Sequence, residues 1–151
     1  FFDITGYNDF DKFMLSLSIV TPGRRVVGPV MVESVTIPGA KGEITVLPEH
    51  ARLLSLVDTG IVTFQREGGR KEHAVVSSGF LEVSKGTVVL LAETLELAQE
   101  IDVDRAKRAK EKAEEKLRAK ESFEQDMEKW QRKFERAQVR LYASEFLLPP
   151  S

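Results

Sequence analysis

The sequence predicts an α+β protein. An N-terminal all-β sandwich of about ten short strands, residues 14–100, precedes a C-terminal antiparallel two-helix hairpin, residues 101–151. Two observations predict this order. Nine of the ten glycines lie between Gly23 and Gly86, among runs rich in β-branched residues. After residue 100 there is no glycine, and proline returns only at Pro149, while strong helix formers such as Ala, Glu, Lys and Arg dominate.

The β half divides into short runs that are punctuated by turn residues. Residues 15–20 alternate apolar and polar side chains, as a half-buried strand does. Residues 26–37 form a second β-rich run, with a bend or bulge expected at Gly28–Pro29 and an end at Pro38–Gly39. Two hairpins follow, one around residues 67–70 and one around residues 84–87. Short strands broken by glycine turns indicate a sandwich or a barrel.

The helical half carries two apolar stripes at helical spacing. We expect helices over residues 103–120 and 123–145, with Asp102 or Asp104 capping the first and a capping box over residues 122–125 starting the second. Small side chains of the first stripe can accept bulky ones of the second; the stripes are Ala106, Ala109, Ala113 and Leu117, and Met127, Trp130, Phe134, Ala137 and Leu141. A single long helix stays open as an alternative, because no glycine or proline forces a turn.

Composition excludes several classes of protein. The chain has 22 basic and 24 acidic residues, and this balance argues against a general nucleic-acid binder. It has no cysteine and only two histidines, so neither disulfides nor a metal site is expected. No apolar run approaches the roughly 18 residues that span a bilayer, so direct membrane insertion is not expected. Residues 1–13 are interpreted as an N-terminal extension or tag remnant, with Met14 as a plausible start.

Three motifs carry a resemblance to a known family. Residues 38–54 read PGAKGEITVLPEHARLL, residues 76–83 read VSSGFLEV, and residues 101–106 read IDVDRA. They are similar to the PG-x-x-GE-x-x-x-LP-x-HA-x-LL, V-S-G-GF-LEV and I/L-D-x-x-R-A patterns of the epsilon subunit of bacterial-type F-type ATP synthases. All three occur in the family's order and at its spacing, from about Leu15 to about Ala143.

The resemblance implies a non-catalytic central-stalk (rotor) subunit of a proton-translocating ATP synthase. Such a subunit couples the catalytic head to the membrane ring, and it restrains ATP hydrolysis through the conformation of its C-terminal helices. Its partners would be the gamma stalk subunit, the c ring and the catalytic alpha and beta subunits. Its place would be peripheral, at the cytoplasmic face of the cell inner membrane. No cofactor is required in this reading.

The resemblance also assigns contacts to individual residues. Glu43, in a loop after Gly42, would meet the membrane ring, and His50 would lie near the stalk subunit. Glu43 also has a simpler interpretation as a solvated acid, and His50 has one as a packed histidine. In the extended hairpin, basic residues would contact an acidic stretch of the catalytic head, although a solvated helix face explains the same charges; the candidates are Arg132, Lys133, Arg136 and Arg140.

In some family members the folded hairpin binds ATP as a regulatory ligand. The positions that match this site are Glu96, Ile101, Asp102, Arg105, Ala106, Lys112, Arg136 and Arg140. Arginine suits phosphate because its guanidinium donates two parallel hydrogen bonds. Lys112 departs from the arginine of the ATP-binding members, keeping the charge but losing that geometry. Helix initiation alone would also explain Asp102 and Arg105.

Two other functions compete with the stalk subunit. A free-standing adaptor or chaperone-like module would use the helical hairpin to grip a partner. An enzyme built on a small β-sandwich is disfavoured, because no nucleophile–base set or pair of carboxylates can be named. The chain has no G-x-x-x-x-G-K motif, which excludes a P-loop nucleotide site.

Overall fold

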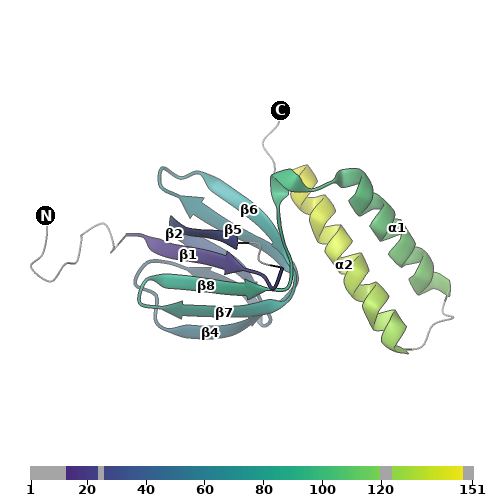
Figure 1. Cartoon of the computed structure of the whole chain (residues 1–151), viewed down its shortest axis with the longest axis horizontal. Coiled ribbons are helices and arrows are strands. Elements are labelled where there is room, and N and C mark those ends of the chain that lie inside the picture. The colour runs from purple at the N-terminus through teal and green to yellow at the C-terminus, as the bar shows by residue number, and fades with distance from the viewer. Residues whose placement is uncertain (1–12, 24–25, 120–123, 148–151) are drawn as a thin grey trace, which may run out of the picture. The chain divides into compact units, whose positions relative to one another are not determined.

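The computed structural model describes residues 13–23, 26–119 and 124–147, and Figure 1 shows its strands and helices. The chain divides into two compact units between Leu95 and Glu96. The N-terminal extension, apart from Phe13, and the start of the predicted capping box at residues 122–125 lie outside the described residues. Nine strands occur in the described ranges: β1 (Leu15–Val20), β2 (Val26–Gly39), β3 (Gly42–Val46), β4 (Leu53–Val57), β5 (Gly60–Arg66), β6 (Lys71–Val76), β7 (Gly79–Ser84), β8 (Thr87–Ala92) and β9 (Leu95–Leu97).

The first unit is a sheet in which the long strand β2 is shared between two layers (Figure 1). The strand order is β1-β8-β7-β4-β2-β5-β6, and β2 also pairs with β1 and β3. The first half of β2 pairs with β1, and its second half pairs with β3 and β5. The register between β1 and β2 shifts between Leu17 and Ile19, opposite Gly28–Pro29, so the predicted bulge is confirmed.

The core of this unit is formed by the inward-facing residues of alternating strands. In β1 the residues Leu15, Leu17 and Ile19 have no exposed surface, whereas the residues between them are half-buried. The largest buried side chain is that of Phe64 on β5. This alternation is what a period-2 pattern predicts when one face of a sheet is buried.

Both predicted hairpins form. Strands β5 and β6 pair from Gly60–Val76 to Gln65–Lys71, and β7 and β8 pair from Gly79–Ala92 to Ser84–Thr87. The β7–β8 turn consists of Lys85 and Gly86, whose φ angles are 47° and 77°. Two positive φ angles in a two-residue turn match the twist of the flanking strands. Glycine adopts this conformation freely, but a lysine does so at a steric cost.

The second unit contains the helical hairpin, which begins after the short 3-10 turn η2 (Ala98–Glu100). Its helices are α1 (Val103–Ala119) and α2 (Glu124–Phe146), which pack against each other. The alternative of one long helix is therefore wrong. Ala106 and Ala113 of α1 and Ala137 of α2 are buried, and Trp130 and Phe134 are half-buried. The small side chains of the three alanines let the helices approach closely.

Candidate functional site

The outer face of the sandwich carries a row of apolar side chains that crosses five strands. Leu56 pairs with Phe80, Phe80 with Leu91, Leu91 with Val20, and Val20 with Val26. Leu56 is 64% exposed, Leu91 is 50% exposed and Phe80 is 39% exposed. We call these five residues the apolar row. A contiguous exposed apolar patch on a small protein is a feature of interaction surfaces.

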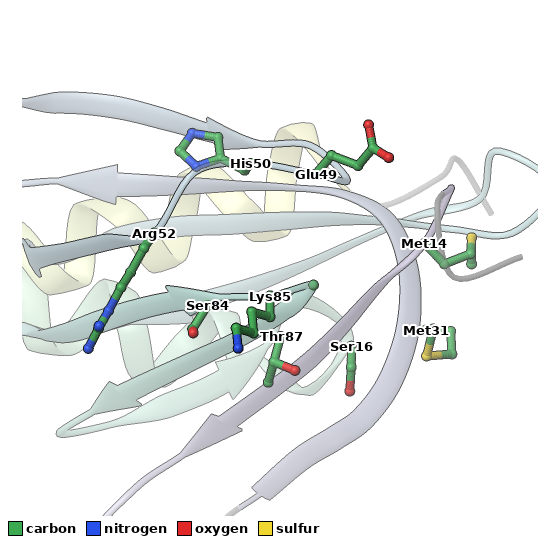
Figure 2. A pocket seen from close by; sticks show the side chains of 10 residues that line it. Met14, Ser16, Met31, Glu49, His50, Arg52, Ser84, Lys85 and Thr87 are labelled. Carbon is green, nitrogen blue, oxygen red and sulfur yellow. The ribbon is translucent and has the colours of Figure 1, made fainter. Parts of the chain in front are cut away.

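The same outer face is more polar four to five residues away from the apolar row along the strands. There Ser84 pairs with Thr87, Thr87 with Ser16, and Ser16 with Met31. These residues form the floor of a groove of about 660 Å³, whose rim carries basic side chains (Figure 2). The groove is lined by Met14, Ser16, Met31, Glu49, His50, Arg52, Ser84, Lys85, Gly86 and Thr87. We call it the basic groove.

The two residues that the sequence assigned to an assembly interface lie in the first unit. Glu43 is exposed, as expected, but it does not lie in a loop. It is the second residue of β3 and pairs with Pro38 of β2. The turn at Ala40–Lys41 is short enough for the chain to resume pairing at once, so the glycine-rich motif forms a hairpin. His50 is half-buried, and its Nδ1 donates to the carbonyl of Ala51 at 2.7 Å.

The candidate nucleotide residues all belong to the second unit. Asp102 caps α1, because its Oδ1 accepts from the backbone N–H of Arg105 at 3.1 Å. The cap prediction is confirmed for Asp102, whereas Asp104 lies in the first turn. Arg140 on α2 donates from Nη2 to Oε1 of Glu96 at 3.0 Å, which joins two predicted residues that are 44 positions apart. The Nε–H of Arg140 is buried and has no hydrogen-bond partner among the described residues.

The other basic candidates lie on the exposed surface of the hairpin. Arg105, Lys112, Arg132, Lys133 and Arg136 are all exposed, and within residues 96–119 and 124–147 none of them forms an ion pair. Ile101 is half-buried beside the cap, and Ala106 is fully buried. The geometry thus joins Glu96 to Arg140, and it places Asp102 at the cap of α1 and Arg105 and Ala106 on its first turn.

Trp130 is surrounded by lysines from both helices. The ammonium groups of Lys112 and Lys133 lie 5.7 and 4.7 Å from its ring centroid. Those of Lys116 and Lys129 lie 6.0 and 5.8 Å away. Each position suits a cation–π contact. Trp130 is therefore a half-buried ring that lysines of both helices contact. Because the ammonium group of Lys112 lies close to the indole, a change at that group would alter the surroundings of the ring.

Few groups of the described residues suit covalent or metal chemistry. No three His, Asp or Glu side chains within the described ranges lie close enough to hold a metal ion. His73 on β6 lies 2.8 Å from the hydroxyl of Thr63, and burial, with the charge of Lys71, lowers the pKa of its imidazole. Neither α1 nor α2 is long and apolar enough to cross a membrane.

Known families and proteins resemble this chain along its length. The family described as "ATP synthase, Delta/Epsilon chain, beta-sandwich domain" matches residues 14–98. The family described as "ATP synthase, Delta/Epsilon chain, long alpha-helix domain" matches residues 99–145. The ATP synthase epsilon chain of Moorella thermoacetica is 45% identical over 104 residues, which cover 69% of this chain and 77% of that one. The chain belongs to the ATP synthase epsilon chain family.

A second epsilon chain, from Carboxydothermus hydrogenoformans, is 47% identical over 103 residues, or 68% of this chain and 75% of that one. A chain of the Euglena gracilis mitochondrial ATP synthase, solved with OSCP, F1 and the c-ring, superposes with a TM-score of 0.66 at 24% identity. That match covers 89% of this epsilon-family chain and 79% of the other, and it shows a shared fold. The predicted resemblance and the sandwich-plus-hairpin fold are thereby confirmed.

Sequence reasoning missed two features of this epsilon-family chain. The apolar row was not predicted, although the alternation of Leu54 and Leu56 in β4 hinted at an apolar outer face. The basic groove was also missed, because Arg52 and Lys85 are 33 positions apart by sequence number and meet only through the sheet. The one local signal of the groove in the sequence was Lys85, which stands directly before Gly86 in the β7–β8 turn.

Proposed function

We propose that this chain is a non-catalytic rotor subunit that couples the catalytic head of an F-type ATP synthase to its membrane ring. Family membership supports this proposal, and so does the apolar row. The row is too exposed to serve the core of its own sheet, and its members are directly paired across five strands. We assign the gamma stalk subunit as the partner that covers it, with the chain peripheral at the cytoplasmic face of the inner membrane.

The membrane ring is the second proposed partner. Glu43 supports this contact because it is exposed beside the β2–β3 turn, at a tip of the sandwich where a polar loop can reach it. His50 lies on a different segment, at the edge of the basic groove. The two residues are therefore proposed to face different partners, with His50 on the stalk side.

The helical hairpin is the proposed regulatory part. Arg132, Lys133, Arg136 and Arg140 would contact an acidic stretch of the catalytic alpha and beta subunits when the hairpin extends. In the folded hairpin Arg140 is held by Glu96 and has 13% of its side chain exposed. Extension would therefore have to break this ion pair and release the arginine. Because the residues at the α1–α2 contact are small, the free-energy cost of separating the helices is modest. A ligand that binds one form slightly better can therefore shift the balance between the folded and the extended hairpin.

ATP is the proposed ligand of the folded form, acting as a regulator and not as a substrate. Arg105 and Arg136 are exposed and free of ion pairs within the described part of the hairpin, and the buried Nε–H of Arg140 lacks an acceptor. A phosphate oxygen could satisfy such a donor. Calorimetry with ATP should detect binding to the wild-type chain and a loss of at least about tenfold in Arg105→Ala/Arg136→Ala. Arg132→Ala is the matched control on the same helix, and unchanged affinity in the double variant would contradict the site.

The main function is tested with a catalytic head and its stalk subunit. The full chain and a chain ending at Glu100 should both bind, and only the full chain should inhibit ATP hydrolysis. Leu56→Ser/Leu91→Ser should bind weakly, whereas Glu67→Ser, in the exposed β5–β6 turn, should bind normally. If neither the full nor the shortened chain binds, the stalk assignment fails and a free-standing adaptor becomes the better explanation.

A further inference from the structure

The basic groove has three properties of a binding site, which are its volume, the side chains of its floor and the charges of its rim. Its volume of about 660 Å³ falls in the range of sites that hold a ligand or a short loop. Its floor consists of Ser16, Ser84 and Thr87, which carry hydroxyl groups, together with the exposed side chain of Met31. Its rim carries the side chains of His50, Arg52 and Lys85. The cationic groups can only donate and the hydroxyl groups can also donate, so the groove suits an acceptor that carries negative charge.

The groove lining contains one acidic residue, Glu49, and its carboxylate does not neutralise the basic side chains. Glu49 lies on the rim, but Figure 2 shows its carboxylate pointing away from the ammonium group of Lys85 and the guanidinium group of Arg52. Neither Arg52 nor Lys85 forms an ion pair among the described residues. Both cations therefore remain available to an incoming anion.

The backbone gives a second, independent observation. Among the described residues, only two non-glycine residues have a positive φ: Glu49 at 66° and Lys85 at 47°. Both line the basic groove. The left-handed region is unfavourable for residues with a Cβ, and such conformations gather at ligand-binding positions. A glycine would adopt the φ of Lys85 at a lower steric cost.

We propose that the basic groove receives an aspartate or glutamate side chain of the stalk subunit, held by Arg52 and Lys85. The inference rests on the proposed function, because the occupant is the partner that covers the apolar row. The two sites share one outer face, and Arg52, which directly precedes β4, lies four residues before Leu56 of the apolar row. At about 3.3 Å per residue, the acidic side chain lies roughly 13 Å from the partner's apolar contact.

The apolar row and the basic groove, at two ends of one outer face, contribute differently to docking. The apolar row supplies contact area without direction, whereas a carboxylate between an arginine and a lysine fixes the register of docking. Because the groove is open to solvent, the charged contact weakens with salt, and the apolar contact does not. Salt dependence therefore separates the two contributions.

The test measures the dissociation constant of the full chain for the stalk subunit at low and high salt. Arg52→Gln removes the guanidinium charge. Lys85→Gly removes the ammonium group and favours the turn, because glycine accepts the positive φ. Arg70→Gln, in the exposed β5–β6 turn, removes one positive charge outside the groove as a matched control. We expect each groove variant to bind about fivefold or more weakly with a flatter salt dependence, and the control to bind as the wild type does.

The outcomes separate the groove from the stalk assignment. Groove variants that bind like Arg70→Gln, with an unchanged salt slope, overturn the groove proposal and leave the stalk assignment in place. A wild-type chain that does not bind the stalk subunit overturns both. Titration with inorganic phosphate, followed through the His50 ring resonances, forms the last arm. Submillimolar phosphate binding that Arg52→Gln abolishes, with unchanged affinity for the stalk subunit, would assign the groove to a free anion and refute an acidic partner.

Discussion

Ala113→Leu should open the helical hairpin. Ala113 has no exposed surface, and it lies on the α1 face that packs against α2. A leucine adds an isopropyl group where the helices are in close contact, so the helices must separate or adopt strained rotamers. Overpacking of this kind costs about 1–3 kcal/mol. That cost corresponds to a shift of roughly 5–150-fold between the folded and the open hairpin.

The assay uses Trp130, which is the only tryptophan of the chain and lies in the hairpin. Urea titration followed by its emission should give a lower midpoint for Ala113→Leu than for the wild type. Ala119→Leu makes the same substitution at an exposed position of α1 and should change stability by less than about 0.5 kcal/mol. An unchanged midpoint for Ala113→Leu would refute the close helix contact. Under the proposed function, Ala113→Leu should also inhibit ATP hydrolysis more strongly than the wild type.

Two further predictions concern the sandwich. A Cβ on Gly79 would lie 1.9 Å from the carbonyl oxygen of Leu91, so Gly79→Ala should lose about 1–3 kcal/mol of stability in calorimetry. Gly23→Ala, whose nearest atom would be 3.9 Å away, should lose almost nothing, and equal losses would contradict the close approach. The pKa of His73 is lowered by burial and by Lys71, so the unfolded chain binds its proton first, and stability should fall as the pH drops below about 6.5. His73→Gln should flatten this part of the stability profile, and an unaltered profile would exclude the imidazole as its cause.

The fold class followed from local patterns in the sequence. The alternation in residues 15–20, the glycine turns and the change in composition near residue 100 each report on a short segment. Helix capping is equally local, because Asp102 reaches the N–H of Arg105 only three residues away. The strands β3 and β4 were not predicted, because each is short and borders a glycine- or proline-rich motif. Pairing with β2 and β7 supplies the hydrogen bonds that these segments cannot form alone.

The sequence by itself determined the two halves, the β5–β6 and β7–β8 hairpins, the helix start and, through its motifs, the epsilon chain family. Only the tertiary structure decided which side chains meet. The apolar row depends on the register of five strands, and a shift of one residue would turn each strand's outward side chains inward. The pair Glu96–Arg140 and the two cations of the basic groove likewise join distant segments. Such contacts are fixed by packing and pairing across the fold, which no short stretch of sequence encodes.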